Sequence, residues 1–234
     1  MKSMGVFRCL AVASVVGLLA LGAARGVGTD EVYRNGAAVS ATDTVEQIVE
    51  KAAQVVPSER QLAWQRGEFI CFVHFGVNTF TAREWGTGME DPKIFQPAKL
   101  DTDQWCRMMK AAGMTQVILT VKHHDGFCLW QTRYTDHSVA SSPWRDGKGD
   151  VLRDLVDSCA RFGIKVGVYL SPADLYQIES ADGLYGNLSE YTERTIPRAV
   201  PGRPFADKRT FTFRVDDYNE YFMNQLFELL TEYG

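Results

Sequence analysis

The chain has no long apolar run and no excess of charge of one sign. Its apolar stretch at residues 9–21 follows Lys2 and Arg8, precedes small residues at 22–24, and is too short to favour a transmembrane helix. This arrangement predicts a signal peptide over residues 1–26, an exported protein that is periplasmic or secreted, and no membrane association after the signal is removed. A net charge of −4 over 234 residues gives no reason to expect binding to nucleic acid or to an anionic membrane.

Cysteines are few, and none form a Cys-x-x-Cys motif. Four remain outside the predicted signal peptide, an even number that permits disulfides in an exported protein without requiring them. Cys71, Cys106 and Cys159 fall on the apolar side of predicted strands or helices, where free thiols are commonly buried. We expect buried free thiols, and the spacing leaves the disulfide state of these three residues and Cys128 open.

Extended apolar runs alternate with amphipathic helical patterns from residue 65 onward. Strands are predicted over 69–75, 116–122 and 164–170, and helices over 102–112, 151–162 and from 217 to about 232. Asp101 or Thr102 supplies the first helix cap, and Gly113 and Gly163 end the first two helices. This alternation predicts an α/β fold with parallel strands and right-handed crossovers.

The chain also lacks the Gly-x-Gly turn that an open nucleotide-binding sheet needs after its first strand. A (β/α)8 TIM-like barrel is therefore favoured over an open doubly wound sheet. Three strands of the eight are present, so we expect the N-terminal part of an incomplete barrel, truncated after Gly234. Residues 27–64 are predicted to form a polar lead-in with a short surface helix that ends at Pro57, and residues 65–234 the truncated barrel domain.

The segment 173–215 is long for a connection between a strand and a helix. It is rich in basic residues, namely Arg194, Arg198, Arg203, Lys208, Arg209 and Arg214. Charge of this kind is expected on a solvated loop, and loops of this length in compact domains often act as lids over a site.

Polar and aromatic residues gather where the predicted strands end. The strand 116–122 is followed directly by His123, His124 and Asp125. In parallel α/β folds these ends open onto the ligand crevice, so we expect one shared site built from His74, Glu84, Trp85, His123, His124 and Tyr169. Imidazoles, a carboxylate, a phenol and an indole suit a small polyhydroxylated ligand, because polar groups reach hydroxyls while aromatic rings cover the apolar faces of a sugar.

Two other interpretations of these residues stay open. Trp85 and Tyr169, taken singly, are as consistent with packing as with binding. Clustered His and Asp at strand ends are also typical of a metal-dependent hydrolase on the same barrel. Such barrels often place their ligands as His-x-His, whereas His123 and His124 are adjacent and are expected to point to opposite faces of an extended chain.

Four stretches of the chain stand out as motifs: Val73-His-Phe-Gly-Val-Asn-Thr-Phe80, Arg83-Glu-Trp-Gly86, Lys122-His-His-Asp-Gly-Phe-Cys-Leu-Trp130 and Gly167-Val-Tyr-Leu-Ser-Pro172. Together they closely resemble the N-terminal part of the barrel of glycoside hydrolase family 29, the α-L-fucosidases. The resemblance runs from about Gln65 to Gly234 and is strongest to the branch that acts on α-1,3- and α-1,4-linked fucose. It implies retaining hydrolysis of terminal α-linked L-fucose through a covalent fucosyl-enzyme on an aspartate, with a separate acid/base carboxylate.

The same resemblance implies that the six strand-end residues bind the fucose: His74, Glu84, Trp85, His123, His124 and Tyr169. It places the nucleophile aspartate and the acid/base residue beyond Gly234, so no catalytic residue is expected in this chain. It implies no cofactor and no metal, and a fucosylated oligosaccharide or glycoconjugate as the partner. Ala173 departs from the tryptophan that many relatives carry after Ser-Pro. An inactive sugar-binding fragment and a metal-dependent hydrolase remain the alternatives.

Overall fold

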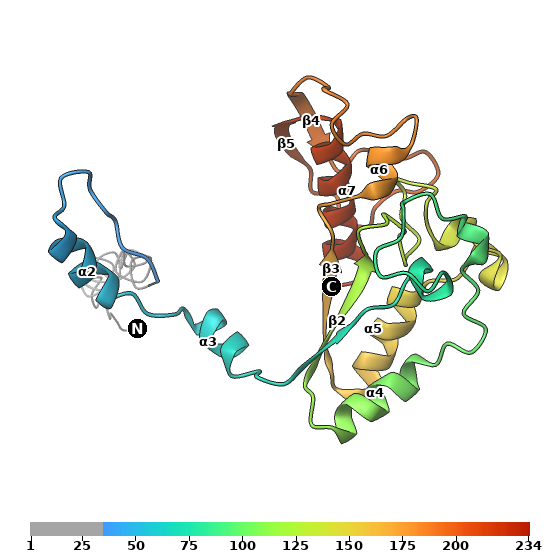
Figure 1. Ribbon diagram of the computed structural model, residues 1–234, viewed down its shortest axis with the longest axis horizontal. Coiled ribbons are helices and arrows are strands. Elements are labelled where there is room, and N and C mark those ends of the chain that lie inside the picture. Colours follow the sequence, from blue (N-terminus) through green and yellow to red (C-terminus); the bar gives the residue numbers. More distant parts are fainter. Residues whose placement is uncertain (1–34) are drawn as a thin grey trace, which may run out of the picture. The chain divides into compact units, whose positions relative to one another are not determined.

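The computed structural model describes residues 35–234, so the predicted signal peptide lies outside the described residues. The chain divides into two compact units, Met1–Glu68 and Phe69–Gly234 (Figure 1). No helix within residues 35–234 is long and apolar enough to cross a membrane.

The first unit contains two short helices, α2 (Val45–Ala53) and α3 (Glu59–Gln65). Each begins with a capping box, in which the hydroxyls of Thr44 and Ser58 accept hydrogen bonds from backbone N–H groups three residues later. The prediction of one helix ended by Pro57 was therefore incomplete. Proline cannot continue a helix, and the serine that follows it starts a new one.

The second unit is built on three parallel strands in the order β1-β2-β3, as the sequence pattern predicted. The strands are β1 (Ile70–Val73), β2 (Gln116–Lys122) and β3 (Lys165–Leu170). Val73 pairs with Leu119, and Leu119 pairs with Val168, so all three strands reach their carboxyl ends at one edge of the sheet. This edge is where the predicted site residues gather.

Helices α4 (Thr102–Ala111) and α5 (Val151–Phe162) lie side by side on one face of the sheet (Figure 1). Alternate residues of β2 point toward them, and Val117, Leu119 and Val121 are fully buried in the resulting core. The predicted caps are confirmed, because the carboxylate of Asp101 accepts from Gln104 N and Gly163 ends α5 in the left-handed conformation.

The opposite face of the sheet carries Phe72, Thr120 and Tyr169. Phe72 is half exposed, and its ring lies 5.8 Å from that of Tyr169, centroid to centroid. Thr120 pairs with Tyr169 in the strand register, which puts both side chains on this face. These three residues line the same cavity as the residues at the carboxyl ends of the strands.

The long basic segment is folded, which corrects the expectation of a solvated loop. It contains α6 (Leu175–Glu179) and an antiparallel hairpin of β4 (Thr192–Ile196) and β5 (Phe211–Val215), followed by α7 (Asp217–Glu232). Figure 1 shows the hairpin beside α7. Arg194 pairs with Asp217 and Glu220 at 2.6 Å each, so its charge is neutralised by the helix that follows.

Short 3-10 turns complete the second unit: Val77–Phe80, Pro92–Ile94, Val139–Ser141 and Trp144–Gly147. The four cysteines within the described residues are free, with Cys71 only half buried. Cys106 and Cys159 are buried between α4 and α5, and their sulfur atoms lie 3.6 Å apart. The prediction of buried free thiols is right for Cys106, Cys128 and Cys159 and wrong for Cys71, which is only partly buried.

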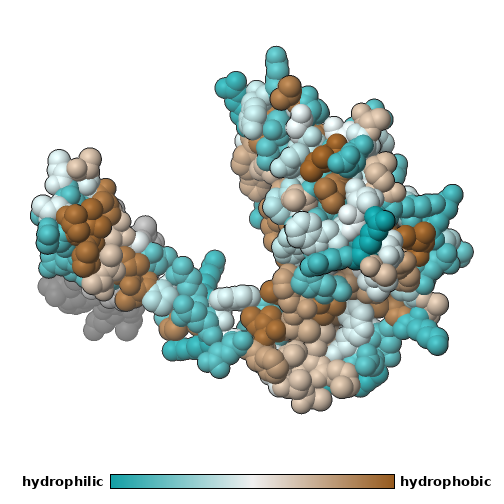
Figure 2. Space-filling model, in the orientation of Figure 1, coloured by the Kyte–Doolittle hydropathy of each residue, from teal (hydrophilic) through white to brown (hydrophobic). Residues whose placement is uncertain are grey.

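Apolar surface remains exposed along the outer strands of the sheet. An open groove beside β1 and α4 is lined by apolar side chains that include Val73, Trp105 and Met108. Figure 2 shows apolar surface in the region where α4 lies in Figure 1. On α7, Leu226 and Leu230 are exposed. Within the described residues β1 and β3 each pair with one strand only.

Candidate active site

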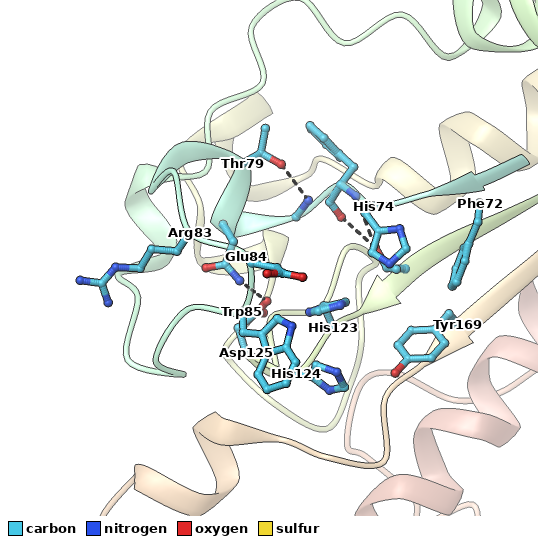
Figure 3. Close-up of a pocket in the computed structure, with 14 residues that line it drawn as sticks. Phe72, His74, Thr79, Arg83, Glu84, Trp85, His123, His124, Asp125 and Tyr169 are labelled. Atoms are coloured by element: carbon cyan, nitrogen blue, oxygen red, sulfur yellow. Dashed lines mark hydrogen bonds between the residues drawn. The ribbon is translucent and has the colours of Figure 1, made fainter.

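A cavity of about 670 Å³ opens at the carboxyl edge of the sheet. All of the six residues predicted from the sequence line it: His74, Glu84, Trp85, His123, His124 and Tyr169. Figure 3 shows these side chains around one hollow, while the guanidinium of Arg83 extends away from the others. No residue between 171 and 215 lines this cavity, so the interpretation of that segment as a lid has no support in the described residues.

Each strand delivers its own part of the site. His74 directly follows β1, His123 directly follows β2, and Tyr169 is the penultimate residue of β3. Trp85 comes from the loop after β1, which turns at Gly86 with φ +69°. A Cβ at Gly86 would lie 2.3 Å from Oδ1 of Asn78, so the loop needs glycine there to pack this closely.

The three imidazoles form a continuous group. Ring centroids are 5.6 Å apart for His74 and His123, and 4.4 Å apart for His123 and His124. The indole of Trp85 lies 5.2 Å from the ring of His124, and Tyr169 lies 6.1 Å from His123. Aromatic rings and imidazoles therefore lie next to one another in the lining of one cavity.

The expectation that His123 and His124 point to opposite faces was wrong. The strand ends at Lys122, and the chain then turns, with Gly126 N donating to His123 O at 3.0 Å. The alternation of side chains applies only to extended backbone, so the turn brings both rings to the same cavity.

Burial and the neighbouring imidazoles shape the chemistry of His123. Its pKa is lowered, mainly by desolvation and secondarily by His124 and His74. A neutral imidazole carries one donor and one acceptor nitrogen, so His123 can pair with a hydroxyl in either sense.

Asp125 holds two loops of the site together through hydrogen bonds. Its carboxylate accepts from Nδ2 of Asn78 and from Phe127 N, both at 2.7 Å, and it is almost fully buried. Burial raises its pKa to about 7. Both oxygens are therefore engaged in holding the turn after β2 against the loop after β1, and Glu84 is the exposed carboxylate of the cavity.

Comparison with known proteins places these features in a family. The model of the α-L-fucosidase family matches residues 89–234. The chain belongs to the α-L-fucosidase family. Two similar structures are described as glycoside hydrolase 29 proteins. One, from a rumen bacterium, is 54% identical with a TM-score of 0.50 and covers 51% of this chain and 22% of that chain. The other, a Ruminococcus gnavus fucosidase in complex with fucose, is 32% identical with a TM-score of 0.56 and covers 75% of this chain and 32% of that chain.

Two further α-L-fucosidase comparisons cover most of the chain. α-L-Fucosidase 1 of Arabidopsis thaliana is 43% identical over 179 residues, which are 76% of this chain and 29% of the plant protein. A Bacteroides ovatus structure assigned to the α-L-fucosidases is 46% identical with a TM-score of 0.66, over 82% of this chain and 28% of that chain. The chain thus spans about three tenths of the length of the curated relatives it matches most extensively.

Sequence reasoning missed several residues of this fucosidase-family cavity, among them Phe72, Asn78 and Thr120. Phe72 lies inside β1, two residues before His74, and Thr120 lies inside β2, three residues before His123. Thr120 Oγ1 accepts from Phe75 N at 3.3 Å and so ties β2 to the residue after His74. The alternation of side chains along each strand was the signal that would have found Phe72.

The arrangement of the described side chains gives no support to a metal-dependent hydrolase. Within residues 35–234, no three His, Cys, Asp or Glu side chains are grouped so that they could hold a metal ion. The three imidazoles contact an aromatic ring and one another in edge-on or tilted arrangements.

Proposed function

We propose that this chain forms the fucose-binding part of a retaining α-L-fucosidase that releases terminal α-linked L-fucose from glycans. One observation carries the proposal: residues from three strand ends and one loop, selected beforehand from the sequence, line a single cavity. Membership of the family and the fucose complex of the Ruminococcus gnavus relative support fucose as the ligand.

The composition of the cavity fits a 6-deoxy sugar. His74, His123 and His124 offer ring nitrogens to hydroxyls, and such bonds strengthen as an oxocarbenium-like transition state develops. Trp85 offers an apolar surface to the methyl group that distinguishes L-fucose from L-galactose. Linkage preference within the family is proposed to follow the α-1,3/1,4 branch, on the resemblance of the strand-end motifs.

The bond-breaking groups are proposed to lie on polypeptide beyond Gly234. Retaining hydrolysis needs two carboxyl groups about 5 to 5.5 Å apart on opposite sides of the bond. Of the carboxylates that line this cavity, Asp125 is held by Asn78 and Phe127, which leaves Glu84 alone. In this proposal the described strands are the first three of a (β/α)8 barrel, whose further elements cover the apolar surfaces beside β1 and on α7.

Export is a separate part of the proposal and rests on residues 1–26 alone. The basic start, the apolar stretch and the small residues at 22–24 support cleavage by a signal peptidase. Sequencing the N-terminus of protein recovered outside the cytoplasm tests this, and an intact Met1 there would contradict it.

Binding of L-fucose is the direct test. We expect calorimetry to detect L-fucose binding, and His124→Ala and Trp85→Ala each to weaken it about tenfold, which is about 1.4 kcal/mol. L-galactose is expected to bind more weakly than L-fucose, because its extra hydroxyl would lose water against the indole.

Trp64→Ala is the matched control. Trp64 is 52% exposed and Trp85 is 58% exposed, but only Trp85 lines the cavity. The control should keep the wild-type affinity, and circular dichroism should show all variants folded. Equal affinities for the two sugars, or His124→Ala with unchanged affinity, would contradict the proposed site.

A hydrolysis assay separates binding from turnover. We expect the 234-residue chain to release no 4-nitrophenol from 4-nitrophenyl α-L-fucoside above the buffer rate, even where it binds L-fucose. Measurable turnover that His124→Ala abolishes would refute the assignment of the carboxyl groups to polypeptide beyond Gly234.

A further inference from the structure

Ser171 lies behind the cavity, one residue after β3, and is fully buried. Its hydroxyl oxygen is 2.8 Å from Nδ1 of His124 and 2.7 Å from the carbonyl oxygen of Ala173. The hydroxyl therefore contacts a ring nitrogen that can donate or accept and a carbonyl that can only accept.

A serine hydroxyl has one proton, which decides the direction of both bonds. Because the carbonyl of Ala173 cannot donate, the hydroxyl proton goes to it, and the lone pairs of the serine oxygen face His124. If Nδ1 of His124 lacked a proton, two lone pairs would face each other at 2.8 Å. Nδ1 must therefore carry the proton, and in the neutral ring Nε2 then carries none.

We propose that Ser171 is a positioning residue that fixes neutral His124 in the Nδ1–H tautomer. In this tautomer Nε2 accepts a hydrogen bond from a hydroxyl of the sugar in the cavity. The second half of this inference rests on the proposed function, since it takes the ligand to be L-fucose. The site thus selects a sugar that presents a hydroxyl donor to His124, and it disfavours an analogue with only an acceptor at that position.

The backbone around Ser171 is fixed relative to His124 from two directions. Ser171 N donates to Lys122 O at 3.0 Å, and Leu175 N donates to His124 O at 2.7 Å. Between these bonds, Nζ of Lys122 lies 2.9 Å from Oδ2 of Asp174, and both side chains are fully buried. The turn that carries Ser171 is therefore anchored to the end of β2 on both sides of the His124 contact.

The tautomer is measurable without any ligand. In protein labelled with ¹⁵N-histidine, long-range ¹H–¹⁵N spectra distinguish a protonated ring nitrogen from an unprotonated one. The chain has four histidines, so each ring is assigned by single substitution. At a pH where the ring is neutral, we expect a protonated Nδ1 and an unprotonated Nε2 for His124.

Ser171→Ala should release this constraint. We expect His124 to shift toward the Nε2–H tautomer and the dissociation constant for L-fucose to rise about tenfold. Ser171→Thr retains the hydroxyl and should restore both. Ser158→Ala is the control for losing a buried hydroxyl, because Ser158 bonds to Thr102 Oγ1 at 2.7 Å and does not line the cavity. It should change neither the tautomer nor the affinity.

Wild-type His124 in the Nε2–H tautomer would overturn the inference, and this outcome does not depend on any variant folding. An unchanged tautomer in folded Ser171→Ala would overturn it as well. If wild-type protein shows the Nδ1–H tautomer but binds no L-fucose, the proposed function and the sugar-binding half of the inference are refuted, while the role of Ser171 in setting the tautomer is supported.

Discussion

His137 is the one histidine that strand-end reasoning did not select, and it is the most buried of the four. It is 3% exposed and stacks on Tyr176 with ring centroids 4.3 Å apart and planes 2° from parallel. Its Nε2 has no hydrogen-bond partner among the residues that the structure describes. Burial lowers its pKa to about 4 from an ordinary value of 6.5, so it is neutral in the folded protein at pH 7.

His137 should make the protein sensitive to acid. Between pH 6.5 and pH 4 the unfolded chain protonates this residue and the folded chain does not, so its contribution to the free energy of unfolding falls as the pH falls through this window. The difference in pKa corresponds to about 3 kcal/mol. The pKa of Asp125 is raised to about 7, so Asp125 adds to the free energy of unfolding as the pH falls through the same window. The pH dependence of wild-type stability alone therefore does not isolate the effect of His137.

The informative quantity is the difference between wild type and His137→Gln. Urea unfolding at pH 7, 6, 5 and 4 should show wild type losing stability relative to the variant by up to about 3 kcal/mol toward low pH. Asp125 is present in both proteins, so its own titration contributes to both unfolding curves. A difference that stays constant across these four pH values would mean that His137 is protonated in the folded protein as readily as in the unfolded one.

At the scale of elements, the helix ends follow rules that are local in the chain. Helix α5 begins after Asp150, whose carboxylate accepts from Arg153 N, and ends at Gly163 with φ +67°. Apart from the adjoining backbone, no atom lies within 4 Å of a Cβ built on Gly163, so the requirement for glycine there is conformational.

Replacing Gly163 with alanine should therefore cost backbone energy without any clash. We expect Gly163→Ala to lower the free energy of unfolding by about 1 kcal/mol, measured by urea unfolding. Gly76→Ala is the matched control, because Gly76 also has open space around its Cβ but has an extended φ of 179° that any residue adopts. The control should lie within about 0.5 kcal/mol of wild type. Equal losses at both positions would rule out the left-handed cap as the cause.

At the scale of the whole molecule, the site belongs to one unit. Every residue that lines the cavity lies in Phe69–Gly234, and the helices α2 and α3 belong to the other unit. The helices α2 and α3 therefore lie outside the unit that carries the proposed binding site.

A protein that begins at Phe69 should keep the site. We expect its dissociation constant for L-fucose to stay within about twofold of that of the whole chain, because a change of that size is below about 0.5 kcal/mol. Calorimetry measures the affinity, and near-ultraviolet circular dichroism checks that the shortened protein is folded. A folded protein with a tenfold weaker affinity would show that residues 1–68 contribute to binding.

The sequence by itself determined the three parallel strands, the helix caps and the candidate site residues. These features depend on local rules: alternation along a strand, side chains that cap a helix, and the shared edge where parallel strands end. Residues such as His74 and Tyr169 could be selected because each occupies a definite place relative to its own strand.

Only the tertiary structure decided how those residues meet. The contact between His124 and Ser171 spans 47 positions of the chain, and the buried pair of Lys122 and Asp174 spans 52. The hairpin of β4 and β5 was missed because its strands are only five residues long and mostly exposed, and because it is tied to α7 through Arg194. A distance between residues far apart in sequence is set by the packing of whole elements, and no local pattern encodes it.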